Sequence, residues 1–312
     1  MQGFHHTVLQ IIRQPRTQIL CGFFFVLVIS LVGISDNTFW EDEANTALFA
    51  RNLIHQGQLT AWDGSNVIGY IGGYELNQSL QNVIIPPLQY YVAAAGMLIF
   101  GETELGARMP SVILGALSIL VLGWASKGFI SERAAQGIPA VVAATSAAML
   151  LFIPHARYFS ASLFFATLIL GLWANLGDRN TAGQNHFVLK SVIGMAACSG
   201  LFYSNYYMAP AMVACLVPLM LFPKFRTRQH KILIALLSVN IFLMLGYVLT
   251  DATVLYRLEH SDPLANPLMN FMLLLKWHIF GLSAFEFMPF LLVPLLMLPG
   301  YLGGAKPCCP IA

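Results

Sequence analysis

Charged side chains are what this sequence has least of. Only 10% of its 312 residues are Asp, Glu, Lys or Arg, whereas 57% are hydrophobic. A soluble globular domain carries roughly 25% charged residues, because charge covers the surface that faces water. A surface that faces lipid needs no such cover. The composition therefore excludes an ordinary soluble domain and predicts an integral membrane protein.

Several patterns that carry chemistry in other proteins are also missing. The five cysteines are Cys21, Cys198 and Cys215 inside apolar runs and the adjacent Cys308 and Cys309 near the C-terminus. They form no disulfide framework, and the chain has no zinc or phosphate-binding-loop spacing. We expect no cofactor, although a requirement for a divalent metal stays open. The net charge of +2 is too small to indicate a nucleic-acid partner.

Long apolar runs divide most of the chain. A helix of roughly 20 apolar residues crosses a hydrocarbon core of about 30 Å. We predict spans at about 18–35, 110–126, 136–153, 159–176, 187–203, 207–222 and 231–250, with one or two more between 269 and 304. No cleavage site follows the first run, so it is a retained span rather than a signal peptide. The expected fold is an all-α, polytopic transmembrane bundle over 18–304, flanked by a cytoplasmic N-terminus at 1–17 and a tail at 305–312.

Charge asymmetry sets the expected orientation. The run from Pro86 to Phe100 has only about 15 residues, and if it does not cross, most lysines and arginines fall on one side. The cations left on the opposite side are then Arg51, Arg108, Arg157 and Arg257. Because basic loops stay in the cytoplasm, we predict a cytoplasmic N-terminus. Residues 36–109 then form one long extracytoplasmic loop that contains short interfacial helices.

That loop concentrates the acidic residues. Its acids are Asp36, Glu41, Asp42, Glu43, Asp63, Glu75, Glu102 and Glu104. Residues 42–55 have the apolar spacing of an amphipathic helix, which ends at Gly57, and the Asp42–Glu43 pair lies in its first turn. These carboxylates either complement the helix dipole or provide a general base at the boundary between lipid and water.

Two other groups of residues suit substrate binding. Arg157 and Tyr158 follow a predicted span, and a guanidinium fork matches phosphate geometry, although a snorkelling interfacial arginine explains the position equally well. Arg108 is a weaker case of the same kind. The Pro86–Tyr91 run begins a helix with two prolines and ends in two tyrosines, and a plain membrane anchor also explains it.

In this order, the motifs resemble those of a known family. They are Asp42-Glu43-Ala44, Ala50-Arg51-Asn52-Leu53 with Gly57, Pro86-Pro87-Leu88 with Tyr90 and Tyr91, Ala107-Arg108-Met109-Pro110-Ser111, and Ala156-Arg157-Tyr158 with Ser160. Together they cover about residues 36–210. The chain resembles the GT-C membrane glycosyltransferases, in the branch of the protein O-mannosyltransferase-like enzymes and the lipopolysaccharide-core and lipid A sugar transferases.

The resemblance implies an activity and a set of roles. Such enzymes take a sugar from a polyprenyl-phosphate carrier and transfer it to a glycolipid, polysaccharide or protein of the cell envelope. It implies a place in the bacterial inner membrane, with Asp42 as the base that activates the acceptor and Glu43 as its support. Arg157 is expected to bind the carrier phosphate. The other expected substrate-binding residues are Tyr158, Arg108, Pro87, Tyr90 and Tyr91.

The chain departs from the family pattern in two places. Many relatives have a second acid shortly after the arginine, where this chain has Ser160-Ala161-Ser162. Relatives also usually continue well beyond 312 residues, so the resemblance implies a truncated member. Two other functions stay open. One is an inactive relative that binds a lipid-linked sugar or a partner, and the other is a secondary transporter. The nearly acid-free spans argue against the transporter.

Overall fold

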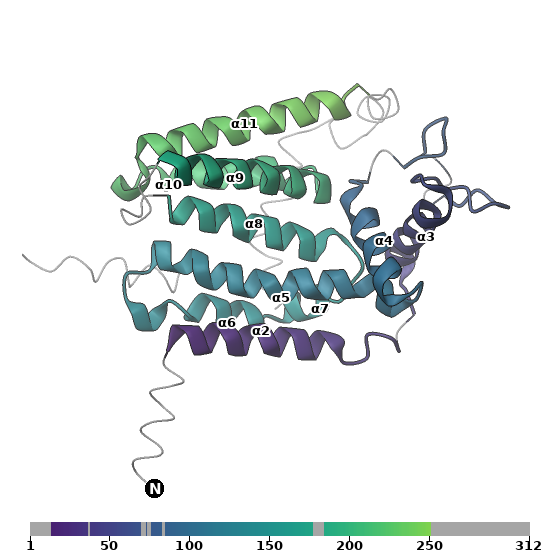
Figure 1. Ribbon diagram of the computed structural model, residues 1–312, viewed down its shortest axis with the longest axis horizontal. Coiled ribbons are helices and arrows are strands. Elements are labelled where there is room, and N and C mark those ends of the chain that lie inside the picture. The colour runs from purple at the N-terminus through teal and green to yellow at the C-terminus, as the bar shows by residue number, and fades with distance from the viewer. Residues whose placement is uncertain are drawn as a thin grey trace, which may run out of the picture.

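The structure is a bundle of helices (Figure 1), taken from a computed structural model that describes residues 14–36, 38–69, 73, 76–82, 85–176 and 184–250. Its helices are α2 (Pro15–Leu31), α3 (Glu41–Gln56), α4 (Leu88–Phe100), α5 (Glu104–Phe129), η1 (Arg133–Ala135), α6 (Ile138–Ala144), α7 (Ala147–Phe152), α8 (Tyr158–Ala174), α9 (Gln184–Ser204), α10 (Met208–Leu219), η3 (Pro223–Phe225) and α11 (Arg228–Val248). Within this part of the chain, the 59–82 segment has isolated β-bridges but no strand forms. The predicted all-α class is confirmed. The spans expected between 269 and 304 lie outside the described residues.

Three helices are long and apolar enough to cross a membrane. They are α5, α11 and the part of α9 from His186 to Ser204. The apolar helices α2 and α8 have 17 residues each and α10 has 12. At 1.5 Å per residue, 17 residues extend for roughly 26 Å, which is slightly less than a hydrocarbon core of about 30 Å.

The segment predicted as one span at 136–153 is two short helices, so the prediction of a continuous helix is wrong. Between α6 and α7, Ser146 has an extended backbone with φ −68° and ψ 124°. The Thr145 hydroxyl donates to the carbonyl oxygens of Val141 and Val142, at 3.0 and 3.3 Å. Such local side-chain bonds compete with the helical ladder and favour helix ends over helix interiors.

The long helices lie roughly along one common direction, with α2, α9 and α11 running one way and α5 and α8 the other, so the bundle has two distinct ends (Figure 1). At one end the Lys190 ammonium donates to the Asn175 carbonyl at 2.8 Å, and Lys224 donates to Gly128. We call this the basic end, because its cations include Lys127, Arg133, Lys190, Lys224, Arg226, Arg228 and Lys231. At the opposite end α2 finishes and both α5 and α8 begin.

Helices α3 and α4 cover this opposite end, which we call the acidic end (Figure 1). Gly57 closes α3 in a left-handed conformation at φ 73°, and its N–H bonds to the Leu53 carbonyl, as the sequence predicts. After α4 the chain turns sharply at Gly101. A Cβ added at Gly96 would come within 2.2 Å of the Gly106 carbonyl oxygen, so only glycine lets α4 pack so closely on the start of α5.

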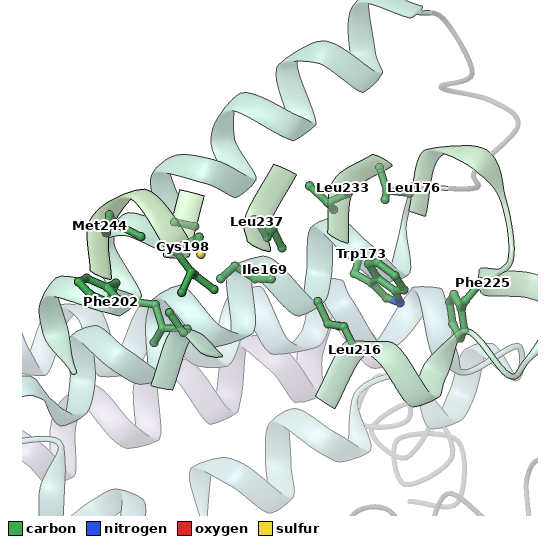
Figure 2. Packing of buried hydrophobic residues seen from close by; sticks show 14 residues of the cluster. Ile169, Trp173, Leu176, Cys198, Phe202, Leu216, Phe225, Leu233, Leu237 and Met244 are labelled. Carbon is green, nitrogen blue, oxygen red and sulfur yellow. The ribbon is translucent and has the colours of Figure 1, made fainter. Parts of the chain in front are cut away.

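A large apolar core fixes α8 in the bundle. Trp173 of α8 packs with Phe225 of η3, and with Leu233 and Leu237 of α11, and all four side chains are fully buried (Figure 2). Each large buried side chain contributes roughly 1.5–3 kcal/mol relative to leaving it exposed. This core therefore holds α8 rigidly, and with it the α8 N-terminus at the acidic end.

Candidate functional site

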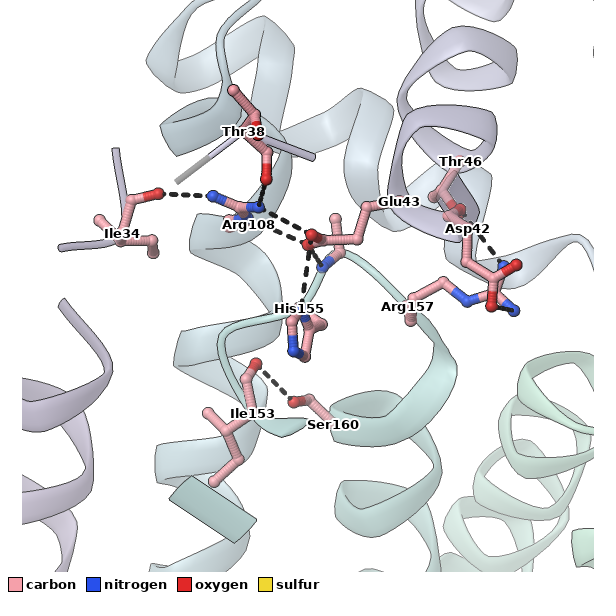
Figure 3. Close-up of polar contacts among 11 residues, drawn as sticks. Ile34, Thr38, Asp42, Glu43, Thr46, Arg108, Ile153, His155, Arg157 and Ser160 are labelled. Atoms are coloured by element: carbon pink, nitrogen blue, oxygen red, sulfur yellow. Dashed lines mark hydrogen bonds and ion pairs between the residues drawn. The ribbon is translucent and has the colours of Figure 1, made fainter. Parts of the chain in front are cut away.

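The first turn of α3 points its two predicted catalytic carboxylates in different directions (Figure 3). Consecutive residues of an α-helix are about 100° apart around its axis, so Asp42 and Glu43 cannot face the same environment. The Glu43 side chain is 1% exposed, whereas that of Asp42 is 20% exposed. The structure therefore gives the two neighbours separate partners and separate tasks.

Glu43 is the centre of a buried polar network. Its Oε1 accepts from Arg108 Nε at 3.0 Å and from the backbone N–H of Ala156 at 2.8 Å. Its Oε2 accepts from Arg108 Nη2 at 2.7 Å and lies 3.4 Å from Nδ1 of His155. Two parallel bonds between a guanidinium and a carboxylate fix both groups strongly. Glu43 thereby joins α3 to α5 and to the segment between α7 and α8.

Arg108 is committed to the protein on its remaining sides too. Its Nη1 donates to the Ile34 carbonyl at 2.8 Å, and Nη2 reaches the Thr38 carbonyl at 3.3 Å. Its guanidinium carbon lies 5.0 Å from the centre of the Phe39 ring. With 5% of its side chain exposed, Arg108 fastens the end of α2 to α5. The structure places this predicted substrate-binding residue inside the buried network.

The same contacts keep Glu43 ionised. Burial by itself would raise the pKa of this carboxyl group, but hydrogen bonds from His155, Arg108 and the neighbouring backbone amide outweigh burial. Together they lower the pKa of Glu43 from its usual 4.5 to about 2. A carboxylate with such a low pKa is a poor proton acceptor at neutral pH. Glu43 is therefore suited to holding the site in place.

Asp42 pairs with Arg157, which lies 115 positions later in the chain. Arg157 Nη2 is 3.0 Å from Asp42 Oδ2, and Nη1 is 3.4 Å from the Asp42 carbonyl oxygen. The Arg157 side chain is only 9% exposed, and its Nε has no hydrogen-bond partner among the described residues. Its guanidinium carbon lies 5.4 Å from the centre of the Tyr158 ring. The predicted base and the predicted phosphate-binding cation are thus in direct contact.

Arg157 is also the N-cap residue of α8, with φ −134° and ψ 177°. The first N–H groups of a helix have no intrahelical acceptor, and they give this end a partial positive charge. The guanidinium and the helix terminus therefore create positive potential at the same place, which Asp42 neutralises in part. An anionic group such as a phosphate has the charge to take the place of Asp42 here.

The predicted substrate-binding residues Pro87, Tyr90 and Tyr91 lie at the start of α4, the helix that packs on α3. Pro87 is the N-cap residue of α4, and Tyr90 is 1% exposed, with its ring stacked on Phe49 at 5.0 Å between centroids. Tyr91, in contrast, is 51% exposed. The packing of Tyr90 holds α4 on α3, so this run supports the helix that carries Asp42.

Sequence reasoning missed His155 and Trp40 as site residues. Their ring centroids are 5.5 Å apart at an angle of 50°, and Trp40 is 44% exposed. Each precedes a predicted site residue by two positions, since Trp40 comes before Asp42 and His155 before Arg157. Their closeness in sequence to two predicted site residues is the signal that could have identified them. In the described part of the chain, no group of three or more His, Cys, Asp or Glu residues is arranged to hold a metal ion.

Comparison with known proteins gives a limited result. The chain is similar to an uncharacterized protein of Aquifex aeolicus (strain VF5), with 26% identity over 152 residues. The match covers 47% of this chain and 27% of the relative, so it spans about a quarter of the relative's length. No known family model matches the chain, and no solved structure matches it.

Proposed function

We propose that the protein is a membrane glycosyltransferase that moves a sugar from a polyprenyl-phosphate carrier to an acceptor hydroxyl at the acidic end of the bundle. The observation that carries the proposal is the partly exposed ion pair between Asp42 and Arg157. It brings a carboxylate and an incompletely bonded guanidinium together beside a helix N-terminus. A transferase of this kind needs a base for the acceptor and a cation for the departing phosphate.

The ion pair suggests how binding prepares the reaction. The donor phosphate competes with Asp42 for Arg157, and its arrival frees the carboxylate. Asp42 then takes the proton of the acceptor hydroxyl while the acceptor oxygen bonds to the anomeric carbon of the sugar. The bond between that carbon and the phosphate oxygen breaks, and the carrier leaves as its phosphate. Arg157 and the α8 N-terminus stabilise the charge that develops on the leaving group.

The proposal includes a place in the bacterial inner membrane, with the basic end in the cytoplasm. Except for Glu132, every acid of the described residues lies at the acidic end, and none lies midway along α5, α9 or α11. Secondary transporters place ionisable groups near the bilayer midplane, so this distribution favours the transferase. A relative that binds a lipid-linked sugar without turnover is the second candidate, since Asp42 is already neutralised in part by Arg157.

Transfer of a labelled sugar tests the proposal most directly. The full chain is incubated with polyprenyl-phosphate sugars and envelope acceptors, with and without a chelator. Labelled product that requires the protein supports the transferase, and loss of product with the chelator adds a metal requirement. Donor binding without product in any combination supports the inactive relative instead.

Accessibility of the two ends tests the orientation. Ser65 lies on an exposed turn of the 61–68 segment, which leads from α3 at the acidic end, and Thr227 is exposed at the basic end. In a background without native cysteines, a cysteine at Ser65 is expected to react with an impermeant thiol reagent added to intact cells. A cysteine at Thr227 is expected to react only after the membrane is permeabilised. The opposite labelling pattern would reverse the proposed sidedness.

Arg157→Lys is expected to lose at least about tenfold in donor affinity. An ammonium group keeps the charge but has no planar fork, so it cannot hold a phosphate by two parallel hydrogen bonds. The measurement is the donor KM in the transfer assay, with Arg51→Lys as the matched control on the exposed surface of α3. An unchanged donor KM in Arg157→Lys would assign Arg157 a snorkelling or purely structural role.

A further inference from the structure

We propose that Trp40 and His155 form the subsite that binds the sugar ring of the donor, and that this sugar is a pyranose. This inference rests on the proposed function, because it extends the phosphate site at Arg157 to the group that the phosphate carries. It assigns a binding role to two residues that the proposed reaction does not otherwise use.

The two rings form a corner rather than a stack. Their centroids are 5.5 Å apart and their planes meet at 50°, so the rings diverge on one side. The Phe152 ring is also near His155, at 6.3 Å between centroids. Trp40 is 44% exposed and the His155 side chain 26% exposed, so both rings are accessible to a ligand. An exposed indole gives a large, rigid apolar surface that suits the C–H face of a pyranose, with its polar N–H edge still in water.

His155 supplies the polar contact in this corner. Its Nδ1 lies 3.4 Å from Oε2 of Glu43, a carboxylate that Arg108 and the Ala156 amide already hold in its charged form. A fixed negative charge at that distance favours a proton on Nδ1, which then faces Glu43. Nε2 points away from Glu43 and can bond to a sugar hydroxyl, which both donates and accepts.

The corner adjoins the phosphate site along the chain. The backbone N–H of Arg157 donates to the backbone carbonyl of His155 at 2.7 Å, so the chain turns tightly between these two residues. Trp40 likewise precedes Asp42, the partner of Arg157, by two positions. Two residues extend for at most about 7 Å. The corner and the Arg157 site therefore adjoin along both segments, which suits a pyranose joined directly to a phosphate.

The chemistry of the corner suits a ring with one apolar face and a free hydroxyl. The indole contributes the apolar surface, and the imidazole contributes one nitrogen for a hydrogen bond. The nearest fixed charge behind the imidazole is the negative Glu43. Recognition then depends on one hydroxyl that bonds to Nε2 of His155 and on the apolar face of the ring. Loss of one such hydrogen bond changes affinity by roughly fivefold, which corresponds to about 1 kcal/mol.

The test separates sugar binding from phosphate binding. Calorimetric titrations of the detergent-solubilised full chain use inorganic phosphate and a panel of hexose and pentose 1-phosphates, each with its deoxy analogues. The variants are His155→Phe, which keeps an aromatic ring but removes both nitrogens, and Trp40→Ala. Trp62→Ala is the matched control, because Trp62 is exposed to a similar extent, at 40%, on the separate 61–68 segment.

We expect at least one sugar 1-phosphate to bind the wild type about tenfold more tightly than inorganic phosphate. His155→Phe and Trp40→Ala are expected to remove that advantage, while their affinity for inorganic phosphate stays within about twofold of the wild type. One deoxy analogue is expected to lose affinity for the wild type but not for His155→Phe. Trp62→Ala is expected to behave as the wild type.

Three results would overturn the subsite. They are equal or absent binding of phosphate and every sugar 1-phosphate by the wild type, an equal loss of both ligands in His155→Phe, and an unchanged sugar advantage in both corner variants. The transfer assay judges the proposed function separately. Selective sugar binding without transfer would leave the subsite standing and remove the transferase. Sugar transfer by the wild type, together with an unchanged sugar advantage in both corner variants, would leave the transferase standing and remove the subsite.

Discussion

Replacing Asp42 with asparagine is expected to lower the rate of sugar transfer by about 10²–10⁴, because general-base assistance is typically worth that factor. Asparagine keeps the shape of the side chain but removes the basic oxygen. The variant also removes the negative charge that lies 3.0 Å from Arg157, so phosphate no longer competes with a carboxylate. The donor KM is therefore expected to stay the same or fall while kcat falls. The transfer assay measures both constants.

Glu41→Gln is the matched control for this result. Glu41 belongs to the same first turn of α3, where it contributes equally to the helix dipole. A dipole role is worth roughly 0.3–1 kcal/mol and affects stability rather than rate. Small and equal effects of the two substitutions would remove Asp42 from the mechanism and favour a relative that binds without turnover.

Glu43→Gln is expected to lower the free energy of unfolding by about 3–5 kcal/mol. The substitution leaves the Arg108 guanidinium buried without a counter-ion, and breaking a buried pair in this way is strongly destabilising. Arg108→Gln is expected to have a similar effect. The double variant is expected to lose much less than the sum, because no unpaired charge remains. Denaturant unfolding in detergent micelles measures all three, and a loss below about 1 kcal/mol in Glu43→Gln would contradict the network.

Acid is expected to weaken the wild type through the same residue. The folded state lowers the pKa of Glu43 from 4.5 to about 2, so the stabilisation is complete above roughly pH 5 and is lost as the pH falls from 4.5 to 2. A difference of this size corresponds to about 3 kcal/mol. Since other acids titrate in the same range, the informative quantity is the difference between wild type and Glu43→Gln. That difference is expected to shrink with falling pH.

Local patterns in the sequence were enough to predict the helices that build the site. The apolar spacing of α3 and its C-terminal Gly57 are properties of neighbouring residues, and both predictions are confirmed. The prediction of a site at the acidic first turn also followed from local composition. The approximate positions of α5, α8, α9 and α11 followed from apolar runs, because lengths and hydrophobicity are local quantities as well.

The division of labour between Asp42 and Glu43 depends on contacts that no local pattern contains. The partners of Glu43 are 65 and 113 positions away in the chain, and they decide that this carboxylate is buried. For the same reason Arg108 looked like an accessible arginine at a helix start. A buried, charge-paired arginine and an exposed one have the same sequence signature, and only the packing of α3 against α5 distinguishes them.

The long reach of the Glu43 contacts also governs when the site can be assembled during biosynthesis. The amide that completes the network belongs to Ala156, which the ribosome adds 113 residues after Glu43. At roughly 5–20 residues per second, this delay lasts roughly 6–23 s. Throughout that interval the Glu43 carboxylate lacks its final partner. The buried network is therefore completed only after α4 and α5, whose Tyr90 and Arg108 contact α3, have been synthesised.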